Sequence, residues 1–225
     1  EGVSDVRANA FATAAWRKSP AIRDAAEVSP ANVVPEGVET WLLQPLRAPA
    51  VSLPDAAGNN WDLHSIAGNR LLTFAAMGSP ESRAQLRSLA NYKRKLGGLT
   101  VVAVLVDNVA QKDAVRSFTT KEALPFPVLI STAEITGIYN IIFRYLFDRH
   151  RDLGVPTSFL VDGDRMIVKV YQGVIAPERI ASDLRTMPRT STERKKVGLP
   201  FPGTLHMGEF QRNDFTYGVA FFQRG

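Results

Sequence analysis

Short apolar runs and helix-like repeats alternate along the chain between Pro49 and Met187. Continuous apolar runs bounded by glycine or proline are typical of buried strands, and apolar residues three or four apart are typical of helices packed on a sheet. These patterns predict strands at residues 51–54, 61–63, 71–76, 99–106, 126–130, 157–161 and 167–171. They predict helices at residues 79–96, 112–122, 133–149 and 177–187.

The order of these elements indicates the class of fold. A strand–helix–strand–helix–strand order requires parallel strands joined by crossover helices. The last two strands are joined by Asp162-Gly163-Asp164, which is a strong signal for a hairpin turn and adds antiparallel pairing; the ligands that a calcium loop would also need are missing. We expect an α/β fold with a central mixed β-sheet, helices on both faces, an N-terminal arm and a C-terminal helical extension.

The helix predicted at residues 79–96 has signals at both ends. Ser79 is a favourable N-cap, Pro80 suits the first helical position, and Glu81 lies where the helix dipole favours negative charge. Gly97 and Gly98 follow directly and are typical of a helix end. We therefore expect this helix to begin at Ser79.

The ends of the chain do not share the regular pattern. Residues 1–48 are interpreted as a linker or arm, with a short helix near residues 8–17 and a segment at 39–46 that either forms a strand or packs on the main domain. Residues 49–188 form the predicted domain. Residues 189–225 are interpreted as a linker followed by the start of a helical repeat.

Composition excludes several classes of function. The chain has 225 residues and no cysteine, so it has no disulfide, thiolate metal site or cysteine nucleophile. Its three histidines lack the spacing of metal ligands, and we expect no metal and no cofactor. The net charge is +5, but the clearest basic run is only residues 194–196, interpreted as a solvated loop rather than a nucleic-acid site. No apolar run approaches the ~20 residues that span a bilayer.

Three stretches of the chain are similar to one known family. Residues 48–55 (APAVSLPD) resemble the opening segment of the redoxin branch of thioredoxin-like proteins, and residues 74–83 (FAAMGSPESR) resemble its active-site loop. Residues 154–162 (GVPTSFLVD) resemble the segment that carries its cis-proline. The branch includes secreted or membrane-anchored thiol–disulfide oxidoreductases of the TlpA-like kind and AhpC/TSA peroxiredoxins. The resemblance implies a thioredoxin-like fold.

The departure from the family lies at its chemistry. In the resemblance, the two redox cysteines fall on Ser79 and Ser82, and the preceding tryptophan falls on Gly78. Thiol exchange needs a thiolate, which a serine hydroxyl cannot replace. Serine is also what experimenters substitute for cysteine, but the loss of the tryptophan is not required by such a substitution and favours a natural loss. The positions Gly78, Ser79, Pro80, Glu81 and Ser82 are therefore predicted to be a degenerate redox site with no catalytic residue.

The resemblance also implies a groove beside that loop. Val155, Pro156 and Thr157 would form its wall, with a cis bond before the proline, and active relatives hold an extended substrate peptide there. Separately, Asp107 ends a parallel strand, where α/β folds often place ligands. Two interpretations stay open: the groove binds a segment of the same polypeptide, such as the arm before Pro49, or it is solvated surface.

Residues 215–225 (FTYGVAFFQRG) resemble the first helix of a tetratricopeptide repeat. The whole arrangement is similar to large secreted bacterial proteins that place a redoxin-like domain before such repeats. This resemblance implies a periplasmic or extracellular location. It implies, as partners, neighbouring domains of the same polypeptide or another protein.

Three functional hypotheses follow. The first is a redox-inactive interaction or scaffolding module. The second is a thiol–disulfide oxidoreductase or peroxiredoxin-like enzyme whose cysteines have been replaced. The third is a small-molecule or anion binder that uses the old active-site groove. The natural residues at positions 79 and 82 distinguish the first two.

Overall fold

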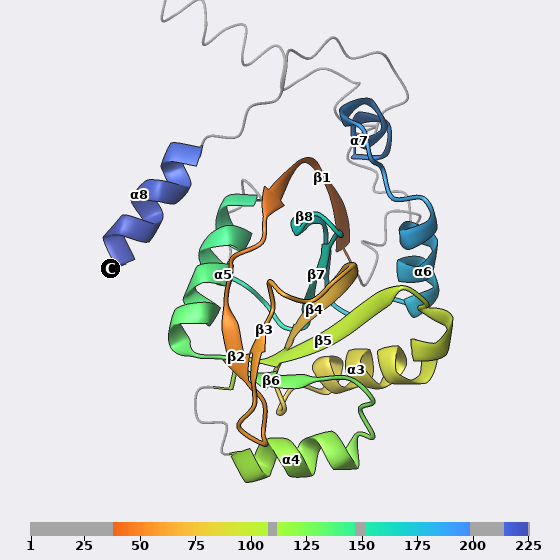
Figure 1. The fold of residues 1–225 in the computed structure, drawn as a ribbon, viewed down its shortest axis with the longest axis vertical. Coiled ribbons are helices and arrows are strands. Elements are labelled where there is room, and N and C mark those ends of the chain that lie inside the picture. Colours follow the sequence, from red (N-terminus) through yellow and green to blue (C-terminus); the bar gives the residue numbers. More distant parts are fainter. Residues whose placement is uncertain (1–37, 108–111, 147–151, 199–213, 225) are drawn as a thin grey trace, which may run out of the picture. The chain divides into compact units, whose positions relative to one another are not determined.

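The fold is built on a six-stranded mixed sheet (Figure 1). The computed structural model describes residues 38–107, 112–146, 152–198 and 214–224, so the short helix expected near residues 8–17 lies outside the described residues. The strands of the main sheet, in spatial order, are β1 (Val38–Arg47), β8 (Met166–Gln172), β7 (Thr157–Val161), β4 (Asn69–Ala75), β5 (Leu99–Leu105) and β6 (Val128–Ile130). A separate hairpin pairs β2 (Ser52–Pro54) with β3 (Asn60–Asp62).

The pairing within the sheet is parallel on one side and antiparallel on the other. β4, β5 and β6 are parallel, whereas β7 is antiparallel to both β4 and β8. The β7–β8 connection is the predicted hairpin turn, where the carboxylate of Asp162 accepts the backbone N–H groups of Asp164 and Met166 at 3.0 and 2.8 Å. The expected mixed α/β sheet is therefore confirmed.

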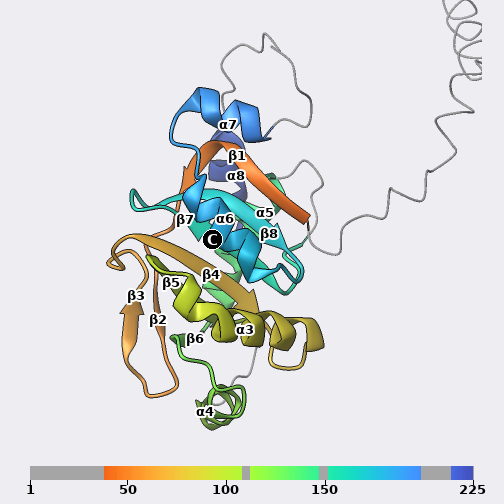
Figure 2. The same ribbon diagram turned by 90° about the vertical axis from the view of Figure 1, so that its right-hand side faces the viewer.

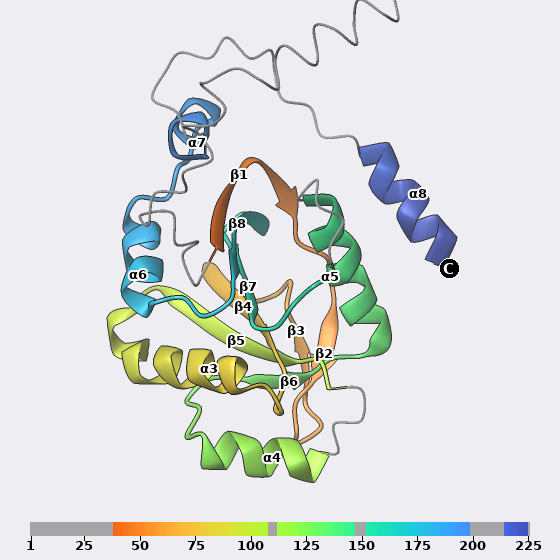
Figure 3. The same ribbon diagram turned by 180° about the vertical axis from the view of Figure 1, so that it is seen from behind.

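Helices cover both faces of the sheet (Figures 1 and 3). They are α3 (Pro80–Tyr92), followed by a 3₁₀ turn (Lys93–Lys95), α4 (Lys112–Lys121), α5 (Ala133–Leu146), α6 (Pro177–Arg185), α7 (Ser191–Gly198) and α8 (Asp214–Arg224). α3, α4 and α6 pack in one core cluster and α5 in the other. In the part of the chain that is described, no helix combines the length and hydropathy needed to cross a membrane.

β4 shows why the central strands appear as continuous apolar runs. Leu71 and Ala75 point into the core under α3 and α6, whereas Leu72 and Phe74 point into the core under α5. A strand buried on both faces needs apolar residues at consecutive positions. The predicted strand at residues 71–76 is thus explained by its place at the centre of the sheet.

The segment at residues 39–46, which the sequence left open as a strand or as a segment packed on the domain, forms a strand. Val38–Arg47 is the edge strand β1, paired antiparallel with β8, and it lies within the stretch interpreted as an arm. Trp41 and Leu42 are buried on opposite faces of the sheet. The pairing is interrupted between Trp41 and Leu46, so the strand lacks a regular alternation along its whole length.

The segment after the last predicted helix was misinterpreted in part. Residues 189–198 were assigned to a linker with a solvated basic loop, but Ser191–Gly198 is helix α7, which lies beside β1 (Figure 2). Arg194 donates from Nε to the carbonyl of Leu43 at 3.2 Å. A Cβ atom on Gly198 would lie 2.9 Å from Leu43 Cδ2, so helix and strand approach closely there.

α8 overlaps the segment that resembles a tetratricopeptide helix. Its Tyr217 and Ala220 are buried, and the Tyr217 ring lies 5.7 Å from the ring of Tyr145 on α5. Phe222 is 88% exposed. The expected C-terminal helix is therefore observed, and it packs against α5. The assignment to a repeat stays a prediction.

Candidate functional site

The loop between β4 and α3 is closed by its own serine side chains. Ser79 is the N-cap of α3: its hydroxyl oxygen accepts the backbone N–H of Ser82 at 3.0 Å, and its O–H donates to Glu81 Oε2 at 3.0 Å. The Oγ of Ser82 accepts the backbone N–H of Ala76 at 3.2 Å, and Ser82 is fully buried. Both hydroxyls at the family's cysteine positions thus serve as structural hydrogen-bonding groups.

The Ser79–Glu81 contact does not form a nucleophile–base pair of useful strength. The pKa of the Glu81 carboxyl is held below its usual value by its own backbone N–H and by the Ser79 hydroxyl. A general base works best when its pKa lies near the operating pH. The lowered pKa therefore makes Glu81 a poor acceptor for the serine proton.

Asp107 holds the loop from the neighbouring strand. It follows β5, and its Oδ2 accepts the backbone N–H of Met77 at 3.0 Å. Its position at the end of a parallel strand was noted in the sequence, but the contact with Met77 was not, because the two residues are distant in the chain. Asp107 therefore positions the loop.

Gly78 leaves the mouth of the loop open. The residue is exposed, and a Cβ atom built on it would meet nothing within 4 Å. No side chain at this position covers the approach to the loop.

The sheet register brings Val155, Pro156 and Thr157 to the same place. Thr157 pairs with Phe74 near the end of β4, so the residues before it adjoin the 76–82 loop. The Val155–Pro156 peptide bond is cis. The Pro156 carbonyl accepts the N–H of Gly173 at 2.9 Å, whereas the backbone of Val155 makes no hydrogen bond with any other described residue. A free donor and acceptor therefore stand beside the degenerate loop.

Gln85 links α3 to the segment after β8 and was missed by the sequence analysis. It is buried on α3, and its Oε1 accepts the backbone N–H of Ile175 at 2.7 Å. Ile175 follows Val174, which is 38% exposed. In the sequence, the only sign of this contact is a polar residue on the helix face that also carries Leu86 and Leu89.

The described residues contain no group of histidine, aspartate and glutamate side chains able to hold a metal ion. His64 lies in the loop after β3, and His150 and His206 lie outside the described residues. The site as described offers hydrogen bonds and open surface, and it holds no thiol.

Replacing Ser79 by alanine is expected to destabilise the domain by about 1 kcal/mol, because the N–H of Ser82 loses its capping acceptor. Urea unfolding at neutral pH measures the effect. Ser79→Asp retains an acceptor and should stay close to the original stability. Equal losses in both variants would contradict the capping role.

Comparison with known proteins agrees with this geometry. A family model described as Redoxin matches residues 46–187. No curated protein matches the chain at a significant level. A DsbF homologue from Corynebacterium diphtheriae is similar in structure at 13% identity and a TM-score of 0.53, covering 71% of this chain and 96% of that one.

A second similar structure is a secreted thiol-disulfide isomerase from Corynebacterium glutamicum, at 14% identity and a TM-score of 0.52, covering 68% of this chain and 91% of that one. At such identities the likeness concerns the fold. The family model covers most of the chain, and its matched residues include the 76–82 loop and the Val155–Thr157 wall. The chain belongs to the redoxin family.

Proposed function

We propose that this domain is a redox-inactive interaction module, which binds an extended peptide segment along the groove between Gly78 and Val155. The observation that carries the proposal is the contrast between the two sides of the groove. On one side both serine hydroxyls are used to close the loop. On the other side the Val155 backbone has no hydrogen bond to any described residue.

A strand-like segment suits this site for a physical reason. An extended peptide adds to a free backbone edge through main-chain hydrogen bonds, which need no catalytic group. The half-buried side chains of Met77 and Val155 and the partly exposed Val174 give that segment apolar contacts. A peptide with apolar side chains at alternate positions is the class of ligand that fits.

A segment of the same polypeptide is the proposed occupant. A tethered segment has a high effective concentration at the groove, so that even a weak contact is populated. We therefore propose that the ligand acts in cis.

Substituting Gly78 by arginine tests the groove. The side chain would fill the open space, displace the bound segment and raise the exchange rate of the Val155 amide hydrogen about tenfold. Gly97→Arg is a matched control, because Gly97 is also exposed with nothing within 4 Å of a Cβ atom. Hydrogen exchange on the full chain measures both. A Val155 amide that exchanges freely in the unsubstituted protein would refute the binding role.

The second candidate function, a thiol–disulfide oxidoreductase with replaced cysteines, is favoured by the spacing of Ser79 and Ser82 at the start of α3. Ser79→Cys/Ser82→Cys is expected to form a disulfide on oxidation and to reduce insulin, since a helix N-terminus stabilises a thiolate. The unsubstituted chain should leave insulin reduction at the buffer rate. Mass spectrometry and the turbidity assay measure these outcomes, with Ser79→Cys alone as control.

Turnover by the unsubstituted chain would refute the redox-inactive proposal. A double variant that never forms the disulfide would show that the loop no longer has the geometry of thiol exchange. A location outside the cytoplasm and a following repeat region are further proposals. They are supported by the sequence resemblance alone.

A further inference from the structure

A cavity lies at the opposite end of the sheet from the loop between β4 and α3. It has a volume of about 380 Å³ and is enclosed by the β7–β8 turn, the end of α6 and the start of α7. Asn69, the first residue of β4, lines it, whereas the groove follows the last residue, Ala75. At ~3.3 Å per residue the two sites are about 20 Å apart. This cavity is therefore independent of the groove.

Arginine side chains dominate one wall of the cavity. Arg185, Arg189 and Arg194 all line it. Arg194 is anchored, since its Nε donates to the Leu43 carbonyl at 3.2 Å and its Nη1 donates to the Arg189 carbonyl at 2.9 Å. Within the described part of the chain, none of the three guanidinium groups lies within 4 Å of a carboxylate oxygen. Glu193, whose carboxylate accepts the backbone N–H groups of Arg189 and Thr190, is the acidic residue that interacts electrostatically with Arg189. The three guanidinium groups therefore form no direct ion pair within the described part of the chain and can pair with a ligand.

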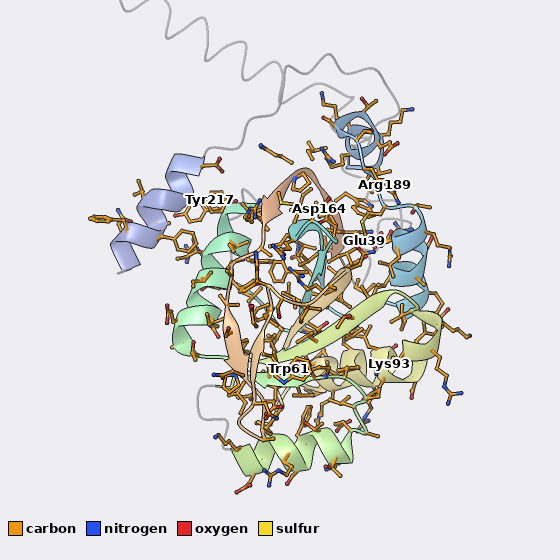
Figure 4. The ribbon with its side chains drawn as sticks, in the orientation of Figure 1. Glu39, Trp61, Lys93, Asp164, Arg189 and Tyr217 are labelled. Carbon is orange, nitrogen blue, oxygen red and sulfur yellow. The ribbon has the colours of Figure 1, made fainter. Side chains whose placement is uncertain are left out.

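The opposite wall carries two carboxylates with different roles. Asp162 uses Oδ1 to accept two backbone N–H groups of the turn. Asp164 is exposed at the tip of the turn, and Figure 4 shows it on the same side of the molecule as Arg189. Three arginines against two aspartates leave the lining with one net positive charge. A ligand here meets guanidinium groups on one side and a hydrogen-bond acceptor on the other.

We propose that this cavity binds a small oxyanion, carboxylate or phosphate, whose other groups include a hydrogen-bond donor. Guanidinium groups pair with oxyanions through two parallel hydrogen bonds, and an anchored arginine loses little side-chain freedom on binding. The ligand's oxyanion lies against Arg185, Arg189 and Arg194. Its donor faces Asp164.

The test is a titration of the full chain with sodium phosphate, followed by amide and arginine Nε–Hε correlations in nuclear magnetic resonance. A parallel titration uses sodium acetate, and sodium chloride of equal ionic strength corrects for screening. We expect saturable shifts at Gly163, Arg189 and Arg194, with no shift at Gly78 or Val155. Saturation by phosphate or by acetate identifies the source of the oxyanion.

Arg189→Gln should weaken the affinity about tenfold, the usual effect of losing one charge-assisted hydrogen bond. Arg116→Gln, which removes an exposed arginine of α4 outside the cavity, should leave it unchanged. Shifts that rise without saturating, or that sodium chloride reproduces, would overturn the proposal. So would equal weakening in the two variants. Thermal unfolding shows that both variants remain folded.

Discussion

Replacing Asp183 by asparagine is expected to lower the free energy of unfolding by about 3 kcal/mol. Asp183 is buried on α6, and its Oδ2 accepts hydrogen bonds from Lys169 Nζ at 2.6 Å and from the Tyr171 hydroxyl at 2.7 Å. The substitution would remove the negative charge that pairs with the Lys169 ammonium, and the lysine side chain is only 1% exposed. Removing one partner of a buried ion pair typically costs ~3–5 kcal/mol.

The expected loss lies at the lower end of that range because Glu39 remains as a partner. Glu39, labelled in Figure 4, has its Oε2 3.1 Å from Lys169 Nζ. Its carboxylate also pairs with Arg179. Burial raises the pKa of Glu39, but hydrogen bonds and charges from Arg179 and Lys169 outweigh it and lower the pKa overall. Glu39 therefore stays ionised at neutral pH. It continues to balance part of the lysine charge.

The phenol of Tyr171 completes the same network. Burial raises its pKa far above the usual value, and the Asp183 charge raises it further. Tyr171 therefore stays protonated and donates to Asp183. The Lys169 ammonium also lies 4.6 Å from the centre of the Trp41 ring, which adds a cation–π contact from β1.

Urea unfolding at pH 7 measures the effect of Asp183→Asn. The control is Lys169→Met/Tyr171→Phe/Asp183→Leu, which removes both charges and the hydroxyl that donates to Asp183, and keeps apolar volume. Since a buried pair can often be replaced by apolar residues without loss, this variant should be more stable than Asp183→Asn. A loss below about 1 kcal/mol in Asp183→Asn, or a triple variant less stable than it, would contradict the role of the network.

The same network marks the limit of what the sequence predicts. Lys169 in a strand indicates an outward-facing position, because lysine is almost never fully buried without a partner. Its partners Glu39 and Asp183 come from β1 and α6, which are distant in the chain. Periodicity cannot reveal such a pairing. For the same reason the sequence left two interpretations open for residues 39–46, a strand or a packed segment, and only the structure shows that they pair with β8.

The central strands and the helix cap were predicted because their causes are local. The apolar run at residues 71–76 reflects burial on both faces, and Ser79 caps α3 through the N–H of Ser82, three residues away. The contacts of Asp107 with Met77 and of Gln85 with Ile175 join residues 30 and 90 positions apart. Such contacts follow from the tertiary fold and have no signature in a single sequence.

Replacing Phe74 by alanine should cost about 3–5 kcal/mol, the usual range for a buried aromatic residue truncated to alanine. Phe74 is fully buried, and its ring lies 4.6 Å from the ring of Tyr139 and 5.6 Å from that of Phe159. The substitution would leave a cavity between the centre of the sheet and α5. Urea unfolding at neutral pH measures the loss.

Tyr139→Phe supplies the matched control within the same cluster. The Tyr139 hydroxyl is buried without a hydrogen-bond partner among the described residues, and an unpaired buried hydroxyl is destabilising. Its removal keeps the ring and should leave the stability unchanged or raise it. A large loss in the free energy of unfolding for Phe74→Ala, with no loss for Tyr139→Phe, would show that ring packing stabilises this core. If Tyr139→Phe were as damaging as Phe74→Ala, the hydroxyl would have to hold a partner in the folded protein, and the packing argument would fail.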